Sequence, residues 1–224
     1  MRPNETLITR RSESLLSTHP VLRNTYLLLS LTLLFSSAMA GFAMINQASN
    51  ASSSILFFVG FGLLFVTSAL RNSAWGILGV FAFTGCMGYS MGPMLNHYLH
   101  EFKNGSQLIL TALGGTGITF FALSAYTLIT KRDLSGWGKT LMIGLVVCIV
   151  ASLANIFLLN MPAIQLAVSS LLVFISSLLI MFDTSRIING GEDNYITATV
   201  ALYLDILVLF QNLLAVLGIF GSKD

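Results

Sequence analysis

Charged residues are scarce in this chain. Asp, Glu, Lys and Arg make up only 9% of the 224 residues, whereas 55% of the residues are hydrophobic. Soluble domains carry about 25% charged residues, so this chain has too few to cover a surface that faces water. We therefore expect the lipid bilayer to surround most of it. The formal net charge of +2 is too small to indicate a nucleic-acid partner.

Cysteine is also rare, and the chain does not begin with an apolar segment. Cys86 and Cys148 both lie in apolar runs, which favours small buried side chains over a disulfide framework. A secretory signal peptide would place an apolar core of about 7–15 residues near the start, but the first residues are polar. We therefore expect residues 1–22 to stay attached as a cytoplasmic N-terminal tail.

Long apolar runs occupy most of the remaining sequence. A helix needs about 20 apolar residues to cross the hydrocarbon core, and backbone groups in lipid must be paired internally. The alternation typical of a transmembrane β-barrel is absent. Seven runs qualify: 26–45, 53–70, 74–95, 108–129, 141–159, 163–182 and 195–219. The sequence predicts an all-α membrane protein with a seven-helix transmembrane domain over residues 23–220 and a short C-terminal tail, 221–224.

The basic residues predict the orientation of these helices, because cytoplasmic loops carry an excess of Lys and Arg. With the N-terminus in the cytoplasm, nine of the 11 basic residues fall on the inner side. They are Arg2, Arg10, Arg11, Arg23, Arg71, Lys131, Arg132, Lys139 and Arg186. Only Lys103 and Lys223 fall on the outer side. We expect a cytoplasmic N-terminus and a C-terminus outside, which is the periplasm for a bacterial inner membrane.

Small residues are frequent within the predicted helices. Glycines are paired at 76 and 79 and at 85 and 88, and three more lie at 114, 115 and 117. Small residues let transmembrane helices approach closely, so we expect all three segments to lie at helix contacts. The last segment lacks the Lys-Ser/Thr of a phosphate-binding loop.

Ionisable side chains at membrane depth are costly and tend to be functional. Asp205 is the only acid or base inside the seven runs, and Asp183 follows the sixth run directly. The sixth helix is expected to continue to the glycine pair at 190–191, which places Asp183 roughly 7–10 Å inside its end. Asp205 lies roughly 15 Å into the last helix. A direct contact therefore requires a tilted last helix or a buried start to it.

Two such acids would share a proton and titrate as a pair if they lie close together. Their oxygens would also suit calcium, which prefers carboxylate ligands, so Asp183 and Asp205 are candidates for a transient calcium site. Arg71 is the nearest candidate counter-ion. The alternatives are a solvated helix-end acid at Asp183, a structural hydrogen-bonding acid at Asp205 and a simple membrane-surface anchor at Arg71.

Sequence patterns typical of enzymes are weak in this chain. The segment His97-Tyr98-Leu99-His100-Glu101 resembles a metal cluster, but we expect it to lie in an outer loop over 97–107 without further ligands. A zinc-protease HExxH and a serine–histidine pair at one depth are both missing. We expect neither an enzyme nor a bound cofactor.

Several motifs resemble the Bax inhibitor-1 family, in particular its bacterial YccA-like branch. They are Met181-Phe182-Asp183-Thr184-Ser185, the glycine pair before Asn194-Tyr195-Ile196, and Leu202-Tyr203-Leu204-Asp205-Ile206 with Leu209-Phe210. The resemblance covers the whole chain and implies a bundle in which the last helix is central and six others surround it.

The resemblance also implies a function. It implies a pH-sensitive calcium leak with an aspartyl pair at Asp183 and Asp205, and an arginine latch at Arg71. The bacterial branch is associated with a membrane-anchored ATP-dependent (AAA-type) protease through the N-terminal tail. This chain departs from the family at Val208, where asparagine is frequent. Two hypotheses follow: a calcium-permeable leak channel, or a non-transporting partner that modulates such a protease.

Overall fold

The computed structural model describes residues 20–221. The predicted tail, apart from its last residues at 20–22, and residues 222–224 lie outside this range. The described chain folds into the helices α2 (Pro20–Ile45), α3 (Asn50–Ala69), α4 (Trp75–Ser90), α5 (Gly92–Glu101), α6 (Gly105–Thr130), α7 (Gly138–Ala154), α8 (Pro162–Ile188) and α9 (Tyr195–Gly221). A 3₁₀ turn, η1 (Ser135–Trp137), precedes α7, and a π-helical turn, η2 (Asn155–Leu159), follows it.

These elements form seven helical segments that are long and apolar enough to cross a membrane. The third segment, Trp75–Glu101, combines α4 and α5, and the fifth, Ser135–Leu159, combines η1, α7 and η2. The sixth continues to Ile188, close to the predicted stop at the glycine pair 190–191. The predicted all-α, seven-span fold class is confirmed, and the chain is an integral membrane protein.

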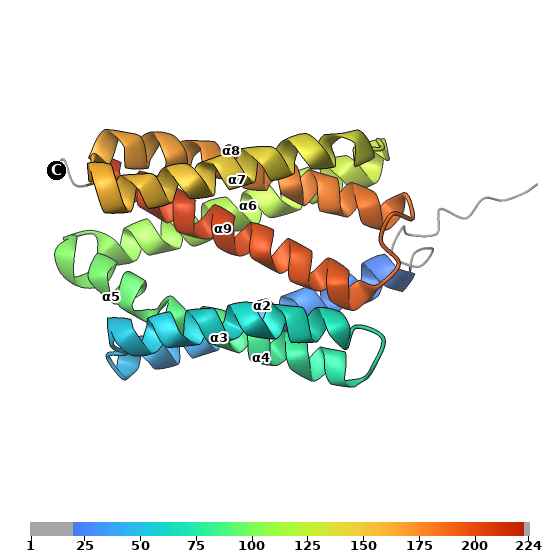
Figure 1. Cartoon of the computed structure of the whole chain (residues 1–224), viewed down its shortest axis with the longest axis horizontal. Coiled ribbons are helices and arrows are strands. Elements are labelled where there is room, and N and C mark those ends of the chain that lie inside the picture. Colours follow the sequence, from blue (N-terminus) through green and yellow to red (C-terminus); the bar gives the residue numbers. More distant parts are fainter. Residues whose placement is uncertain (1–19, 222–224) are drawn as a thin grey trace, which may run out of the picture.

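The last helix lies in the centre of the bundle. α9 packs against α2, α3, α4, α6 and α8, and Figure 1 shows it running obliquely between a layer of α6, α7 and α8 and a layer of α2, α3 and α4. Its side chains dominate the core: Leu202, Tyr203, Leu209 and Leu214 are fully buried. A helix that is apolar all round is expected at such a buried position.

The connection after the third span is shorter than predicted. We expected residues 97–107 to form an outer loop, but α5 continues through His97 to Glu101 and α6 already begins at Gly105. The Tyr98 ring stacks on Phe102, with ring centroids 5.1 Å apart, and it packs against Gly218 of α9. Burial of this aromatic side chain, which the polar neighbours obscure in the sequence, extends the helix.

The glycine segments pack closely at all three predicted places, although not at every glycine. In the third segment the contact is at Gly115, where a Cβ atom would press on Leu213 of α9. A Cβ atom at Gly88 would collide with the backbone of Ser36 in α2, and one at Gly79 would press on Thr67 in α3. These glycines therefore allow α4 to approach both neighbours. The prediction was wrong for Gly114 and Gly117, around which a Cβ atom would meet nothing within 4 Å. Composition shows which residues are small, but not which face of α6 is covered.

The basic residues gather at one end of the bundle. The start of α2, the α3–α4 turn, the α6–α7 connection and the α8–α9 loop share this end (Figure 1). It holds Arg23, Arg71, Lys131, Arg132, Lys139 and Arg186, while Lys103 lies at the opposite end. We call it the basic end. That this end faces the cytoplasm remains a prediction.

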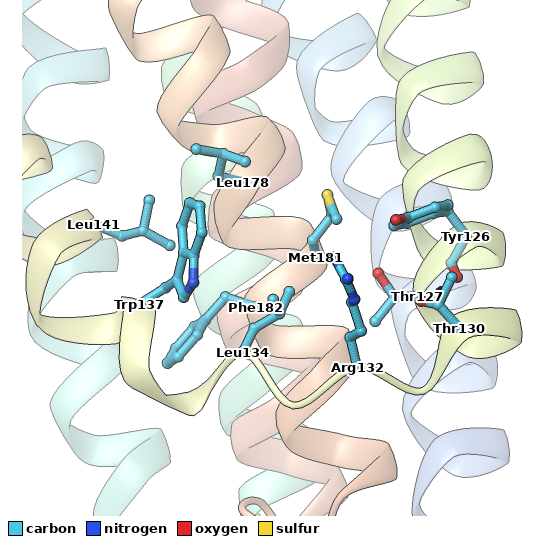
Figure 2. Close-up of a pocket in the computed structure, with 10 residues that line it drawn as sticks. All are labelled: Tyr126, Thr127, Thr130, Arg132, Leu134, Trp137, Leu141, Leu178, Met181 and Phe182. Atoms are coloured by element: carbon cyan, nitrogen blue, oxygen red, sulfur yellow. Dashed lines mark hydrogen bonds between the residues drawn. The ribbon is translucent and has the colours of Figure 1, made fainter.

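A small lateral groove opens near the basic end, between α6 and α7 and over α8 (Figure 2). Both α6 and α7 pack on α8, so α8 forms the floor of the groove.

Candidate functional site

The two predicted acids meet inside the bundle. Asp183 on α8 is 9% exposed and Asp205 on α9 is 7% exposed, and their carboxyl groups lie within hydrogen-bonding reach of each other. Counted along their own helices, the two acids lie at different depths. α9 runs obliquely through the bundle (Figure 1), which is the tilt expected from the sequence for a direct contact.

A close contact between two carboxyl groups requires a proton. Ionised carboxylates only accept hydrogen bonds, so one member must be protonated to donate. The Oδ2 atom of Asp205 is buried and has no hydrogen-bond partner among the described residues. A buried oxygen without a partner is costly, and protonation of the carboxyl group reduces this cost.

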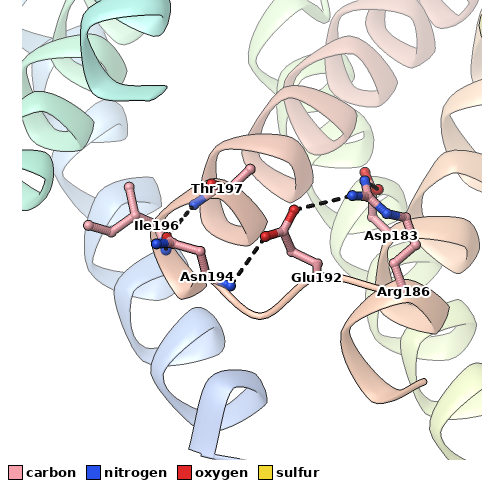
Figure 3. Close-up of polar contacts among 6 residues, drawn as sticks. All are labelled: Asp183, Arg186, Glu192, Asn194, Ile196 and Thr197. Carbon is pink, nitrogen blue, oxygen red and sulfur yellow. Dashed lines mark hydrogen bonds and ion pairs between the residues drawn. The ribbon is translucent and has the colours of Figure 1, made fainter. Parts of the chain in front are cut away.

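Arg186 is the cation that faces the acid pair. Its Nη1 lies 3.4 Å from Oδ1 of Asp183, and its Nη2 lies 3.2 Å from Oε2 of Glu192. Figure 3 shows the Arg186 guanidinium next to Asp183, with its contact to Glu192 marked. The side chain of Arg186 is 35% exposed, whereas those of Asp183 and Glu192 are 12% and 10% exposed. The arginine is therefore more exposed than the two acids with which it pairs.

The loop before α9 is held by the same network. Glu192 Oε1 accepts a hydrogen bond from the backbone N–H of Asn194 at 3.2 Å. Asn194 Oδ1 in turn accepts from the backbone N–H groups of Ile196 and Thr197, at 2.9 and 3.2 Å. This is an N-cap interaction, which satisfies two of the free amide groups at a helix start. The start of α9 is thus linked through Glu192 and Arg186 to Asp183 (Figure 3).

Arg71 does not contact the acid pair in this conformation. It lies exposed in the turn after α3, and its backbone carbonyl, not its guanidinium, accepts a hydrogen bond from Asn194 Nδ2 at 3.0 Å. Within residues 20–221, Asp183 forms its ion pair with Arg186. Arg71 is therefore placed beside the loop before α9, and its predicted role as a latch stays a prediction.

Tyr203 fixes the opposite face of α9. Its hydroxyl lies 2.7 Å from Ser36 Oγ on α2 and donates to the carbonyl of Thr84 on α4 at 3.3 Å. Two residues along a helix turn the side chain by roughly 200°, so Tyr203 points away from Asp205. The Leu-Tyr-Leu-Asp motif therefore anchors α9 to α2 and α4 on one side and presents a carboxyl to α8 on the other.

Val208 occupies an apolar contact. It packs against the cluster of Cys148, Leu172 and Ile175 between α7 and α8. An asparagine at this position would bring an amide to that cluster, so the departure from the family pattern removes one polar group next to α8.

The acid pair is too small to hold calcium permanently. Calcium takes six to eight oxygen ligands, and no group of three or more His, Cys, Asp or Glu side chains within residues 20–221 is arranged to hold a metal ion. Two carboxyl groups supply part of such a shell.

Comparison with known proteins decides the family. The sequence profile of the family described as inhibitor of apoptosis-promoting Bax1 matches residues 18–222. The chain belongs to the Bax inhibitor-1 family. The match covers all seven spans together with Asp183, Arg186 and Asp205.

Several bacterial proteins are similar over nearly the whole chain. The modulator of FtsH protease YccA from Escherichia coli strain K12 is 49% identical over 212 residues, which cover 94% of each chain. The inner membrane protein YccA of Escherichia coli O6:H1 is similar to the same extent. An uncharacterized membrane protein of Vibrio cholerae is 44% identical over 224 residues, covering 99% of this chain and 100% of its own.

Two residues of the site were missed in the sequence. From the sequence, Arg186 was placed only among the basic residues of the inner side, and Glu192 was not singled out. The spacing of Asp183 and Arg186 was a usable signal, because residues three apart on a helix are neighbours. Glu192 carried no comparable signal, since its position depends on how the loop folds back over α8.

Proposed function

We propose that this Bax inhibitor-1 family protein is a pH-sensitive, calcium-permeable leak in a bacterial inner membrane, gated by Asp183 and Asp205. One observation carries the proposal: two carboxyl groups in contact inside the bundle, with a buried oxygen of Asp205 that has no partner in the described chain. Ionisable residues inside a transmembrane bundle are costly and are expected where protons or cations pass.

The gate works through the shared proton. With one proton, Asp205 and Asp183 hydrogen-bond to each other, and α8 and α9 stay together. Loss of this proton leaves two like charges at short distance in a medium of low dielectric, which repel. Arg186 neutralises part of this charge, and the remainder loosens the contact between α8 and α9.

The open pair then attracts a divalent cation, because hard cations prefer carboxylate oxygens. Acidification restores the proton and closes the site. The leak should therefore rise with pH over the range in which the pair titrates.

Calcium flux into liposomes tests this proposal. Wild-type protein would be compared with Asp205→Asn, which keeps the shape of the side chain and removes its charge, between about pH 6 and 8. Asp193→Asn is the matched control, because Asp193 is exposed in the α8–α9 loop at the same end. We expect Asp205→Asn to abolish the pH dependence while Asp193→Asn keeps it. An Asp205→Asn protein with unchanged flux and unchanged pH dependence would make the acid pair structural.

A second function is favoured by the similarity to the modulator of FtsH protease YccA. We propose that the chain also binds and modulates a membrane-anchored ATP-dependent protease through its polar N-terminal tail. The tail carries Arg2, Arg10 and Arg11 and several serine and threonine residues, so it is a segment that such a protease could engage. This function does not require transport.

Deletion of residues 2–18 tests the second proposal, since it leaves every span intact. We expect the truncated protein to insert normally, but to show a changed lifetime and a changed effect on degradation of a membrane substrate. Unchanged lifetime and unchanged degradation would refute the modulator role. Asp205→Asn measured in the same assay separates the two functions, because a tail-dependent partner keeps its activity without the acid pair.

A further inference from the structure

The groove between α6 and α7 has one polar rim and an apolar interior. Its volume is about 150 Å³. Leu141, Leu178 and Met181 line the interior, and Arg132, Trp137 and Tyr126 lie around the opening, together with Thr127, Thr130, Leu134 and Phe182. The groove opens sideways, toward the space that lipid occupies around a transmembrane bundle.

Arg132 is held at this groove by its backbone. The Arg132 carbonyl accepts hydrogen bonds from Ser185 Oγ at 2.8 Å and from Asn189 Nδ2 at 3.4 Å, both near the end of α8. In Figure 2 its side chain rises from the connection into the space between Met181 and Thr127. Within residues 20–221 the ion pairs of the chain are made by Arg186, so the Arg132 guanidinium has no acidic partner there.

The adjacent acid does not neutralise Arg132. Asp133 Oδ1 accepts a hydrogen bond from the backbone N–H of Ser135 at 2.8 Å, at the start of η1. This bond to the Ser135 backbone lowers the pKa of Asp133 below its usual value, so the carboxylate stays ionised and engaged with the turn. The positive charge at the rim is left for another anion.

The rim of the groove also carries two neutral hydrogen-bond donors. The indole N–H of Trp137 and the hydroxyl of Tyr126 make no hydrogen bond to another described residue, and Trp137 is 53% exposed. Tryptophan and tyrosine favour the level of the lipid headgroups. A cation, an indole and a phenol around an apolar slot match a molecule with an anionic phosphate and a hydrocarbon chain.

We propose that this groove binds an anionic glycerophospholipid, with the phosphate on Arg132 and one acyl chain along Leu141, Leu178 and Met181. Basic pockets between transmembrane helices are suited to such headgroups. The groove lies at the basic end, so the lipid would come from the leaflet on that side. The groove is separate from the Asp183–Asp205 contact, and the proposal does not depend on a leak or on a protease.

Native mass spectrometry of the purified full-length protein with added phosphatidylglycerol tests this site. Arg132→Gln removes the cation, and Leu178→Trp fills the groove while keeping Arg132. Lys131→Gln is the matched control, because Lys131 is the neighbouring exposed cation and does not line the groove. Circular dichroism establishes that each variant is folded. If Arg132→Gln does not fold, Leu178→Trp is used to test the proposal instead.

We expect Arg132→Gln to weaken phosphatidylglycerol binding about fivefold or more, Leu178→Trp to weaken it comparably, and Lys131→Gln to leave it near the wild-type value. Phosphatidylethanolamine should bind more weakly than phosphatidylglycerol. Equal binding by wild type and Arg132→Gln would overturn the proposal, and so would an equal loss in Lys131→Gln, which would show general surface charge. Tighter binding after deletion of residues 2–18 would identify the tail as the occupant and also overturn it.

Discussion

Arg186 follows Asp183 by one helical turn on α8, and its Nη1 lies 3.4 Å from Oδ1 of that acid. The same guanidinium reaches Glu192 in the loop that leads into α9. The buried acid and the start of the central helix are therefore joined through one partly exposed side chain. Any movement of α9 relative to α8 must change this contact, which makes Arg186 the residue whose removal is most informative.

Replacement of Arg186 by glutamine should move the pH profile of the leak. Without the cation, ionisation of the acid pair is less favourable, so the proton is retained to higher pH and the flux midpoint rises. Because Arg186 is partly exposed and screened, we expect a rise of roughly 0.5–1 pH unit. Calcium flux in liposomes at a series of pH values measures it, with Lys139→Gln as the control at the same end. A midpoint that falls or stays fixed contradicts the role of Arg186.

Replacement of Tyr203 by phenylalanine should destabilise the bundle without altering the acid pair. The change removes the hydrogen bonds that Tyr203 makes to Ser36 and to the Thr84 carbonyl, at a cost of about 1–2 kcal/mol. Unfolding in detergent measures the loss. Tyr126→Phe serves as a control, since Tyr126 is exposed on α6. Equal stability of the Tyr203 and Tyr126 variants would show that the buried hydroxyl contributes nothing.

Two glycine-to-alanine changes should shift the free energy of unfolding in opposite directions. At Gly88 the added Cβ meets the Ser36 backbone, which cannot move without separating α2 from α4, and overpacking of this kind costs about 1–3 kcal/mol. At Gly117 the added Cβ meets nothing within 4 Å, and alanine is favoured in a helix by up to about 1 kcal/mol. Thermal unfolding of both variants in detergent gives the comparison. A Gly88→Ala protein as stable as Gly117→Ala would refute the close approach.

Labelling of single cysteines should establish the orientation. Ser73→Cys places a thiol in the α3–α4 turn at the basic end, and Asn104→Cys places one in the α5–α6 connection at the opposite end. The excess of basic residues predicts that the basic end is cytoplasmic. A membrane-impermeant maleimide should therefore label Asn104→Cys in intact cells, and Ser73→Cys only after lysis. Cys86 and Cys148 would be replaced beforehand. The reverse labelling pattern would invert the topology.

The number of membrane spans and their helical structure could be predicted from the sequence alone. Each span must bury about 20 residues in hydrocarbon, so hydropathy decides where a helix lies without knowledge of its neighbours. The two membrane-depth acids were also identifiable, because a charge in an apolar run is rare and conspicuous. The end of the third span was not, since the polar residues of α5 hide the burial of Tyr98.

Only the tertiary structure decided which groups meet. Asp205 and Asp183 lie at different depths when counted along their own helices, and the oblique path of α9 brings them together. Arg186, rather than Arg71, pairs with Asp183, because side-chain reach depends on how the loop around Glu192 folds. Gly88 packs at a helix contact and Gly117 does not, for the same reason. Local hydropathy determines that a helix spans the membrane, whereas tilt, rotation and loop path are set by packing between helices.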